Sequence, residues 1–202
     1  GIATSKSDGL TYNEYYGLRV QDEDISLNNP DVSKVVAVYE SLNSNNPSFD
    51  IIGFPTIANV KSNAIVGENI IGSTNNAIAR VVTNQDTNSP FSSGAANKLG
   101  IVYLNENKFS VGELVTFEES EIKTQVDSIT NGNYSDITQS FKLNRGQKNQ
   151  YYDYSRIVRN KNIQEPSRSL VIVFDHYTIP TNDAGDVFTV DSYDSERFSK
   201  DI

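Results

Sequence analysis

Short runs of apolar residues alternate with polar stretches along most of the chain, and the period is that of β-strands. Residues 35–39 and 170–177 are nearly continuous apolar runs, so we expect strands with both faces covered, the second of them central in its sheet. Residues 122–127 alternate between apolar or threonine positions and polar ones, which is typical of a half-buried strand. The pattern predicts a mainly β protein with little helix.

The middle of the chain contains an internal repeat. The motif Val-Gly-Glu at 66–68 recurs at 111–113, an offset of 45 positions. The same offset relates Ile70 to Val115, Ala77 to Ile122, Val81 to Val126 and, with a change of size, Ala64 to Phe109. Each copy has a glycine turn, a short strand, a polar turn and a return strand. Since a lone hairpin cannot bury a core, we expect the two hairpins to pack together or form small barrels.

Turn-forming residues divide the sequence into three predicted parts. These are an N-terminal β module at 1–54, two Val-Gly-Glu hairpin repeats at 55–130 and a C-terminal β module at 131–202. We expect several small β-rich modules, built as hairpin repeats, small barrels or a sandwich. Between the repeats, residues 84–96 are rich in Ser, Asn, Gly and Pro and predict an exposed loop.

The C-terminal part has two further turn signals. Gly146 follows Asn and Arg in a tight turn, where glycine supplies a positive φ. Residues 182–185 turn the chain into an apolar run at 187–190, which predicts a β-hairpin. Residues 151–159 fit either a helical stripe or a strand face.

Composition argues against several classes of function. The chain has 17 basic and 26 acidic residues, a net charge of −9 that disfavours nucleic-acid binding. Cysteine is absent, which excludes disulfides and thiolate chemistry. No apolar run reaches the length of about 18 residues that a membrane span needs. Because methionine is also absent, even at position 1, we expect a segment excised from a longer polypeptide.

The residues from position 141 onward resemble a known class of protein. The runs at 141–147 and 151–158 resemble a recurring element of large virion structural proteins of tailed phages, as in T-even-like phages of marine cyanobacteria and their relatives. Residues 166–175 and 185–193 are similar to the same element, and 200–202 close it. Upstream stretches within residues 17–41, and the Val-Gly-Glu hairpins, also resemble these proteins, so the likeness covers most of the chain.

The resemblance implies a component of a tail, baseplate or fibre. Such a protein is made in the cytoplasm of the bacterial host and resides in the tail region of the virion. Its partners would be other virion proteins, with a homo-oligomer as one possibility. We therefore expect a structural or assembly segment that docks neighbouring subunits.

No residue pattern points to catalysis, a cofactor or a metal. His176 is the single histidine, and without a second one we expect a hydrogen-bonded side chain near a strand end. Asp22, Glu23, Asp24 and Asp31, like residues 182–186, lack the spacing of a calcium loop and read as solvated turns. We predict that the chain is not an enzyme.

Two groups of side chains are candidates for contacts. Exposed tyrosines are good partner contacts, with core packing as the alternative, and the candidates are Tyr12, Tyr15, Tyr16, Tyr151, Tyr152 and Tyr154. An arginine–carboxylate network is expected to hold the second tyrosine group against the 170–177 strand. Its members are Asp153, Arg156, Arg159, Arg168 and Asp175.

Two other functions stay open from the sequence. The first is a receptor-binding module that recognises host-surface glycan through residues 84–96. The second is a tail-associated polysaccharide hydrolase with a carboxylate pair. We rank both below the assembly role, because no catalytic frame is visible and no tryptophan is present to form a sugar platform.

Overall fold

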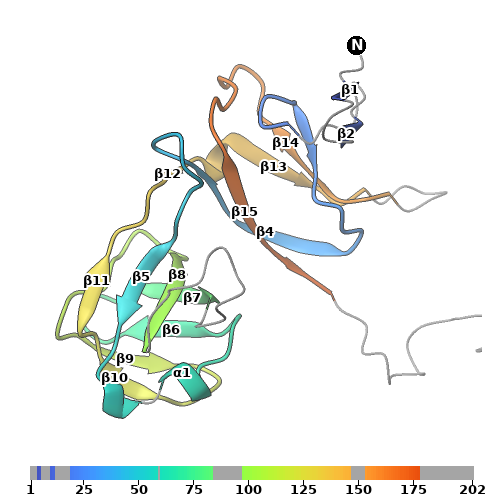
Figure 1. Ribbon diagram of the computed structural model, residues 1–202. Helices are drawn as coiled ribbons and strands as arrows, with labels where there is room; N and C mark the ends of the chain where they lie inside the picture. The colour runs from blue at the N-terminus through green and yellow to red at the C-terminus, as the bar shows by residue number, and fades with distance from the viewer. Residues whose placement is uncertain are drawn as a thin grey trace, which may run out of the picture.

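The computed structural model describes residues 19–58, 60–83, 97–146 and 153–177, together with two short paired strands, β1 (Thr4–Ser5) and β2 (Leu10–Thr11). The described chain is mainly β, as the sequence pattern predicts (Figure 1). Helix within this part is limited to three short turns: η1 (Thr56–Ala58), α1 (Val60–Asn63) and η2 (Thr138–Ser140).

The largest element is a seven-stranded antiparallel sheet. Its strand order is β10 (Lys123–Gln125), β9 (Leu114–Phe117), β6 (Asn69–Gly72), β7 (Ile78–Thr83), β8 (Lys98–Tyr103), β5 (Asp50–Gly53) and β11 (Ser128–Thr130). The first and last strands of this order, β10 and β11, are separated in sequence only by Val126 and Asp127. The two ends of the sheet therefore come together, and the sheet curls into what we call the barrel.

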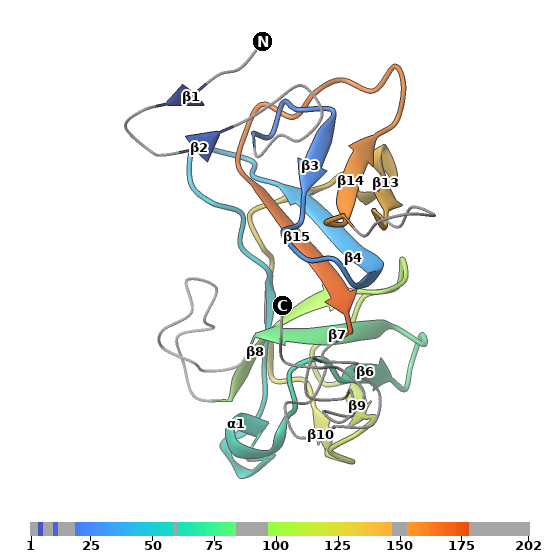
Figure 2. The ribbon, with the colours of Figure 1, turned by 90° about the vertical axis from the view of Figure 1, so that its right-hand side faces the viewer.

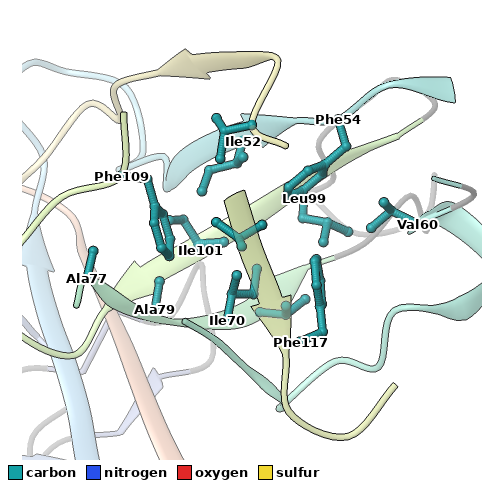
Figure 3. Close-up of a cluster of buried hydrophobic side chains, with 13 residues drawn as sticks. Ile52, Phe54, Val60, Ile70, Ala77, Ala79, Leu99, Ile101, Phe109 and Phe117 are labelled. Atoms are coloured by element: carbon teal, nitrogen blue, oxygen red, sulfur yellow. The ribbon is translucent and has the colours of Figure 1, made fainter. Parts of the chain in front are cut away.

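The barrel encloses the main hydrophobic core. Figure 3 shows these side chains converging from several strands toward one centre. The buried members are Ile52, Phe54, Val60, Ile70, Ala77, Ala79, Val81, Leu99, Ile101, Phe109, Val115, Phe117 and Val126. Ala64 also packs against this core, so both members of the unequal pair Ala64 and Phe109 point inward.

The two hairpin repeats pack together around a local two-fold axis. In the pairing of β6 with β9, Ile71 lies opposite Thr116, and these two positions differ by the repeat offset. On either side of it, Ile70 pairs with Phe117 and Gly72 pairs with Val115. The repeat offset turns one of these pairs into the other, because it relates Ile70 to Val115 and Gly72 to Phe117. The sequence repeat is thus confirmed as a structural one. The return strand at 122–127 also alternates between covered and exposed positions as predicted.

Glu113 joins the two repeats through its buried carboxylate, which is 5% exposed. Its Oε2 accepts a hydrogen bond from the N–H of Ser110 in its own turn, at 2.9 Å. Its Oε1 accepts one from the N–H of Thr74, in the far turn of the first repeat, at 2.9 Å. A Cβ on Gly72 would lie 2.4 Å from this Oε1, so the carboxylate occupies space that only glycine leaves open.

Glu68 makes the equivalent contacts from the first repeat and is 1% exposed. Its Oε1 accepts the N–H of Ile65 at 2.6 Å, within its own turn. Its Oε2 accepts the N–H groups of Ser120 at 2.9 Å and of Glu119 at 3.2 Å, in the far turn of the second repeat. Each glutamate therefore caps its own turn and the turn of the other copy, an arrangement we call the reciprocal glutamate caps.

Two three-stranded sheets lie beyond the barrel (Figures 1 and 2). One has the order β12 (Ser135–Asp136), β4 (Val32–Glu40) and β15 (Leu170–His176). The other has the order β13 (Phe141–Asn144), β14 (Arg156–Arg159) and β3 (Asp24–Ser26). The strand at 156–159 resolves the ambiguity of residues 151–159 in favour of β structure for the described portion.

β4 is the central strand of its sheet and has both faces covered, as predicted for residues 35–39. Val38 packs with Ile25, Phe141 and Ile157 on one side. On the other side, Ala37 and Tyr39 pack with Phe49 and with Val102 of the barrel. β4 thus separates two cores, which is why its apolar run is continuous.

The prediction that residues 170–177 form a central strand is wrong for the part of the chain that the structure describes. β15 pairs with β4 alone there and lies at the edge of the sheet. Its apolar run has another cause. Leu170 and Ile172 pack toward the Val38 core, and Val171 and Val173 pack toward the Tyr39 core, so both faces carry apolar side chains.

Strand pairing crosses the predicted boundaries of the three segments. β4, from the first segment, pairs with β12 and β15 of the third. β5, also from the first, pairs with β8 and β11 in the barrel. The division into 1–54, 55–130 and 131–202 remains a prediction. The expected loop at 84–96 and the hairpin expected at 182–190 lie outside the described residues.

Gly146 has the positive φ that the sequence predicts, +71°, and a Cβ there would lie 2.4 Å from the carbonyl oxygen of Asp153. Gly67 has a φ of +102°, and no atom lies within 4 Å of the place that a Cβ would take there.

We predict that Gly67→Ala costs about 1 kcal/mol of unfolding free energy from backbone strain alone. Gly146→Ala should cost clearly more, because the methyl group also meets backbone. Urea denaturation of both variants checks this, and equal costs would contradict it.

Candidate docking surface

The outer edge of β15 is the most prominent place for a partner strand in the described chain. Its apolar residues, 170–174, are only half-buried, whereas those of β4 are largely buried. On the side away from β4, no described strand pairs with it. An edge of this kind presents backbone N–H and C=O groups that can extend the sheet with another strand. It is therefore our candidate docking surface.

The end of β15 is anchored to the barrel. The guanidinium of Arg80, on β7, binds both carboxylate oxygens of Asp175, with the Nη1–Oδ1 distance at 2.6 Å. Arg80 is itself oriented by Asn69 Oδ1, which accepts from its Nε at 3.2 Å. One residue further, the N–H of Tyr177 donates to the carbonyl of Asp31 at 3.0 Å. A single nitrogen, Nη1, donates to both oxygens, so this pair attaches the end of the strand to the barrel.

The two residues after Asp175 are exposed. His176 occupies the last position of β15, and its ring centroid is 5.9 Å from that of Phe174. Tyr177 is 74% exposed. An exposed aromatic side chain beside an open strand edge suits a contact with another protein. The position of His176 at a strand end agrees with the sequence prediction; no hydrogen bond from its ring is described.

The predicted arginine–carboxylate network is only partly present as such. Arg156 is buried and lies 3.9 Å from Asp153, as expected, and 3.7 Å from Asp24 of β3. Burial raises the pKa of Asp24, and the charge of Arg156 opposes this. The group therefore ties β14 to β3, and Asp175, which was expected to join it, binds Arg80 instead.

The other two arginines of that prediction bind backbone carbonyls. Arg159 donates from Nη1 to the carbonyl of Gln21 at 3.0 Å. Arg168 donates from Nη1 to the carbonyl of Leu42 at 2.5 Å. Both attach neighbouring segments to the strand sheets without a carboxylate partner among these contacts.

Of the six candidate tyrosines, Tyr154 alone belongs to the part that is described in full. It precedes β14 and is 54% exposed, which suits the predicted role in partner contact. Tyr12, Tyr15, Tyr16, Tyr151 and Tyr152 lie outside the described residues.

A polar joint between the barrel and the β4 sheet was not found from the sequence. Tyr39 of β4 stacks on Tyr134, with ring centroids 3.9 Å apart. The Tyr134 hydroxyl donates to Oδ2 of Asp50 at 2.7 Å, and the N–H of Gly132 donates to Oδ1 at 2.7 Å. Asp50 is 4% exposed and lies on β5 of the barrel, where Lys108 approaches it at 3.4 Å. We call this group the Asp50 joint.

The sequence contained a signal for the Asp50 joint and for the Arg80–Asp175 pair. Asp50 stands between Phe49 and Ile51, and Arg80 and Asp175 also interrupt apolar strands. A charged residue in such a run needs a partner when it is covered, because an unpaired buried charge is costly. The signal says that a partner exists; it does not say which residue provides it.

We predict that stability falls as the pH rises above about 10, the ordinary pKa of tyrosine. Burial raises the pKa of Tyr134, as does its hydrogen bond to Asp50, and burial also raises that of Tyr39. The folded state therefore favours the neutral phenols, and their contribution is lost once the unfolded chain can ionise.

In Tyr134→Phe, the unfolding free energy at neutral pH should drop by about 1–2 kcal/mol, since Asp50 loses a donor. The further decline above pH 10 should become shallower, and Tyr177→Phe, at an exposed position, serves as control. Denaturation across the alkaline range measures both effects. An unchanged pH slope in Tyr134→Phe would count against the joint.

Among the described residues, no group of three or more His, Asp or Glu side chains is placed to hold a metal ion. In the acidic stretch, Asp22 pairs with Arg19 at 3.1 Å. None of the described helices has the length and apolar character to cross a membrane.

In comparisons with known proteins, no family model, no curated protein and no solved structure matches this chain.

Proposed function

We propose that this chain is a structural segment of a phage tail, baseplate or fibre protein and docks neighbouring virion subunits. The observation that carries the proposal is the open edge of β15, an apolar strand that pairs on one side only within the described chain. The resemblance of residues 141–158 to virion structural proteins supports the location in the particle. Host-cell synthesis followed by incorporation into the tail region is part of the same proposal.

The way β15 is held supports a docking role. Arg80 binds Asp175 at one end of the strand, and the Asp50 joint fixes the β4 sheet against the barrel. A strand that is already attached to the rest of the fold loses little conformational entropy when a partner strand adds to it. Tyr177 and Tyr154, both exposed, offer aromatic contacts next to the strand sheets.

The proposal is tested on particles. Gold-labelled antibody fragments raised against the folded chain should mark the tail, baseplate or fibres of purified phage in electron micrographs. Label confined to free protein in the lysate, with unlabelled particles, would contradict the assignment.

The edge itself is tested by a lysine substitution, because lysine on an edge strand blocks pairing with another strand. Phe174→Lys, within the half-buried run of β15, should reduce incorporation into particles. Ile57→Lys is the matched control, since Ile57 is 95% exposed on the barrel. Circular dichroism confirms that both variants fold. Equal incorporation of the two folded variants would remove β15 from the docking surface.

A further inference from the structure

A groove opens between β4 and β13, on the side of β4 away from β15. Its volume is about 330 Å³. Four apolar residues line it, Val35, Phe141, Leu143 and Ile157, together with the polar residues Ser33, Thr138 and Gln139 and the two lysines Lys34 and Lys142. We call it the basic groove. Phe141 and Ile157 belong to the Val38 core and are buried, so Val35 and Leu143 supply most of the apolar surface that a ligand could reach.

The positive charge of the basic groove is free to meet a ligand. Lys34 and Lys142 are exposed, and neither forms an ion pair with the described residues. Asp175 lies opposite Lys34 in the strand register, but its carboxylate is bound by Arg80. At the rim, Arg145 donates from Nη2 to the carbonyl of Ser33 at 2.9 Å and adds a third cation.

Asp136 is a carboxylate two residues before Thr138, which lines the groove. Its Oδ1 accepts the N–H of Thr138 at 2.9 Å and the hydroxyl of Thr138 at 2.6 Å. It is thus engaged by Thr138. Three cations thus lie around one groove in a chain whose net charge is −9.

A surface of matching character lies on the barrel. The turn between β9 and β10 carries three exposed carboxylates, Glu118, Glu119 and Glu121, of which Glu118 also accepts a hydrogen bond from Asn69 Nδ2 at 2.7 Å. Beside it are two exposed apolar residues, Ile65 and Val66, which are 46% and 51% exposed. We call these five residues the acidic tip.

Glu68 fixes the two halves of the acidic tip side by side. One carboxylate oxygen binds the N–H of Ile65, and the other binds the N–H of Ser120 in the acidic turn. The apolar and acidic parts of the tip are therefore presented together on a rigid support.

The acidic tip and the basic groove are at opposite ends of the molecule. Figure 1 shows β9 and β10 at the end of the barrel farthest from β13 and β4, and Figure 2 agrees. The two surfaces cannot meet within one copy of the rigid fold. Each is complementary to the other in charge and in its apolar component.

We propose that the acidic tip of one copy docks in the basic groove of a second copy. The carboxylates approach Lys34 and Lys142, and Ile65 and Val66 cover the half-buried Val35 and Leu143. Because the two surfaces differ, the contact is head-to-tail and leaves a free groove and a free tip on every pair. Repetition of the contact builds a ring or a filament. The inference deepens the proposed assembly role by naming a second copy of this chain as one partner.

The first repeat supplies a matched control for the acidic turn. By the repeat offset, Ser73, Thr74 and Asn76 correspond to Glu118, Glu119 and Glu121. Asn76 and Glu121 share a positive φ, 55° and 57°. The triple variant E118S/E119T/E121N therefore gives the second turn the uncharged side chains of the first, in a backbone that already accepts them.

Sedimentation velocity of the full chain tests the contact. At low salt, the weight-average mass should rise with protein concentration, and 0.5 M NaCl should reverse the rise because exposed charges are screened. K34E/K142E and E118S/E119T/E121N should each remain monomeric, while E106S, at an exposed position elsewhere on the barrel, should behave as the unchanged chain.

Mixing the two monomeric variants decides the geometry. K34E/K142E keeps its acidic tip and the triple variant keeps its basic groove, so a one-to-one mixture should form a heterodimer and nothing larger. A mixture that stays monomeric while the unchanged chain associates overturns the proposal, as does an unchanged chain that is monomeric at every concentration and salt. Neither result affects antibody labelling of particles, which tests the assembly role separately.

Discussion

The fold of the barrel depends on two buried carboxylates that each hold two turns. Glu68 and Glu113 sit at equivalent places of the repeat, and each accepts backbone N–H groups from its own copy and from the other. These charge-assisted hydrogen bonds satisfy backbone N–H groups of the turns, which would otherwise be buried without an acceptor. The caps therefore explain both the recurrence of Val-Gly-Glu and the two-fold register of β6 with β9.

The barrel in turn supports the sheets. Asp50 and Arg80 both stand on barrel strands, and they hold Tyr134 and Asp175 respectively. Through the Tyr39–Tyr134 stack and the anchored end of β15, the β4 sheet acquires a defined position. The same Glu68 carboxylate that completes the barrel also presents the acidic turn. Contacts that hold the barrel and its neighbouring sheet together thus also support β15 and the acidic tip.

Much of the fold could be predicted from local patterns, because the strand period, the glycine turns and the repeat can each be recognised from the order of residues along the chain. The continuous run at 35–39 signalled a strand between two cores, and the structure agrees. The same reasoning misplaced 170–177, since an edge strand between two cores has the same apolar run as a central one. The partners of Asp50, Arg80 and Asp175 could not be predicted, because they come from segments distant in sequence.

The measurement that tests the central claim most directly is the unfolding free energy of Glu68→Gln and Glu113→Gln. Both carboxylate oxygens accept N–H donors, so glutamine must turn its NH₂ toward a donor whichever way it faces. The account predicts that each variant loses about 2 kcal/mol, whereas Glu106→Gln, at an exposed position, changes by less than about 0.5 kcal/mol. If both cap variants unfold at the same urea concentration as the unchanged chain, the reciprocal glutamate caps do not hold the barrel together.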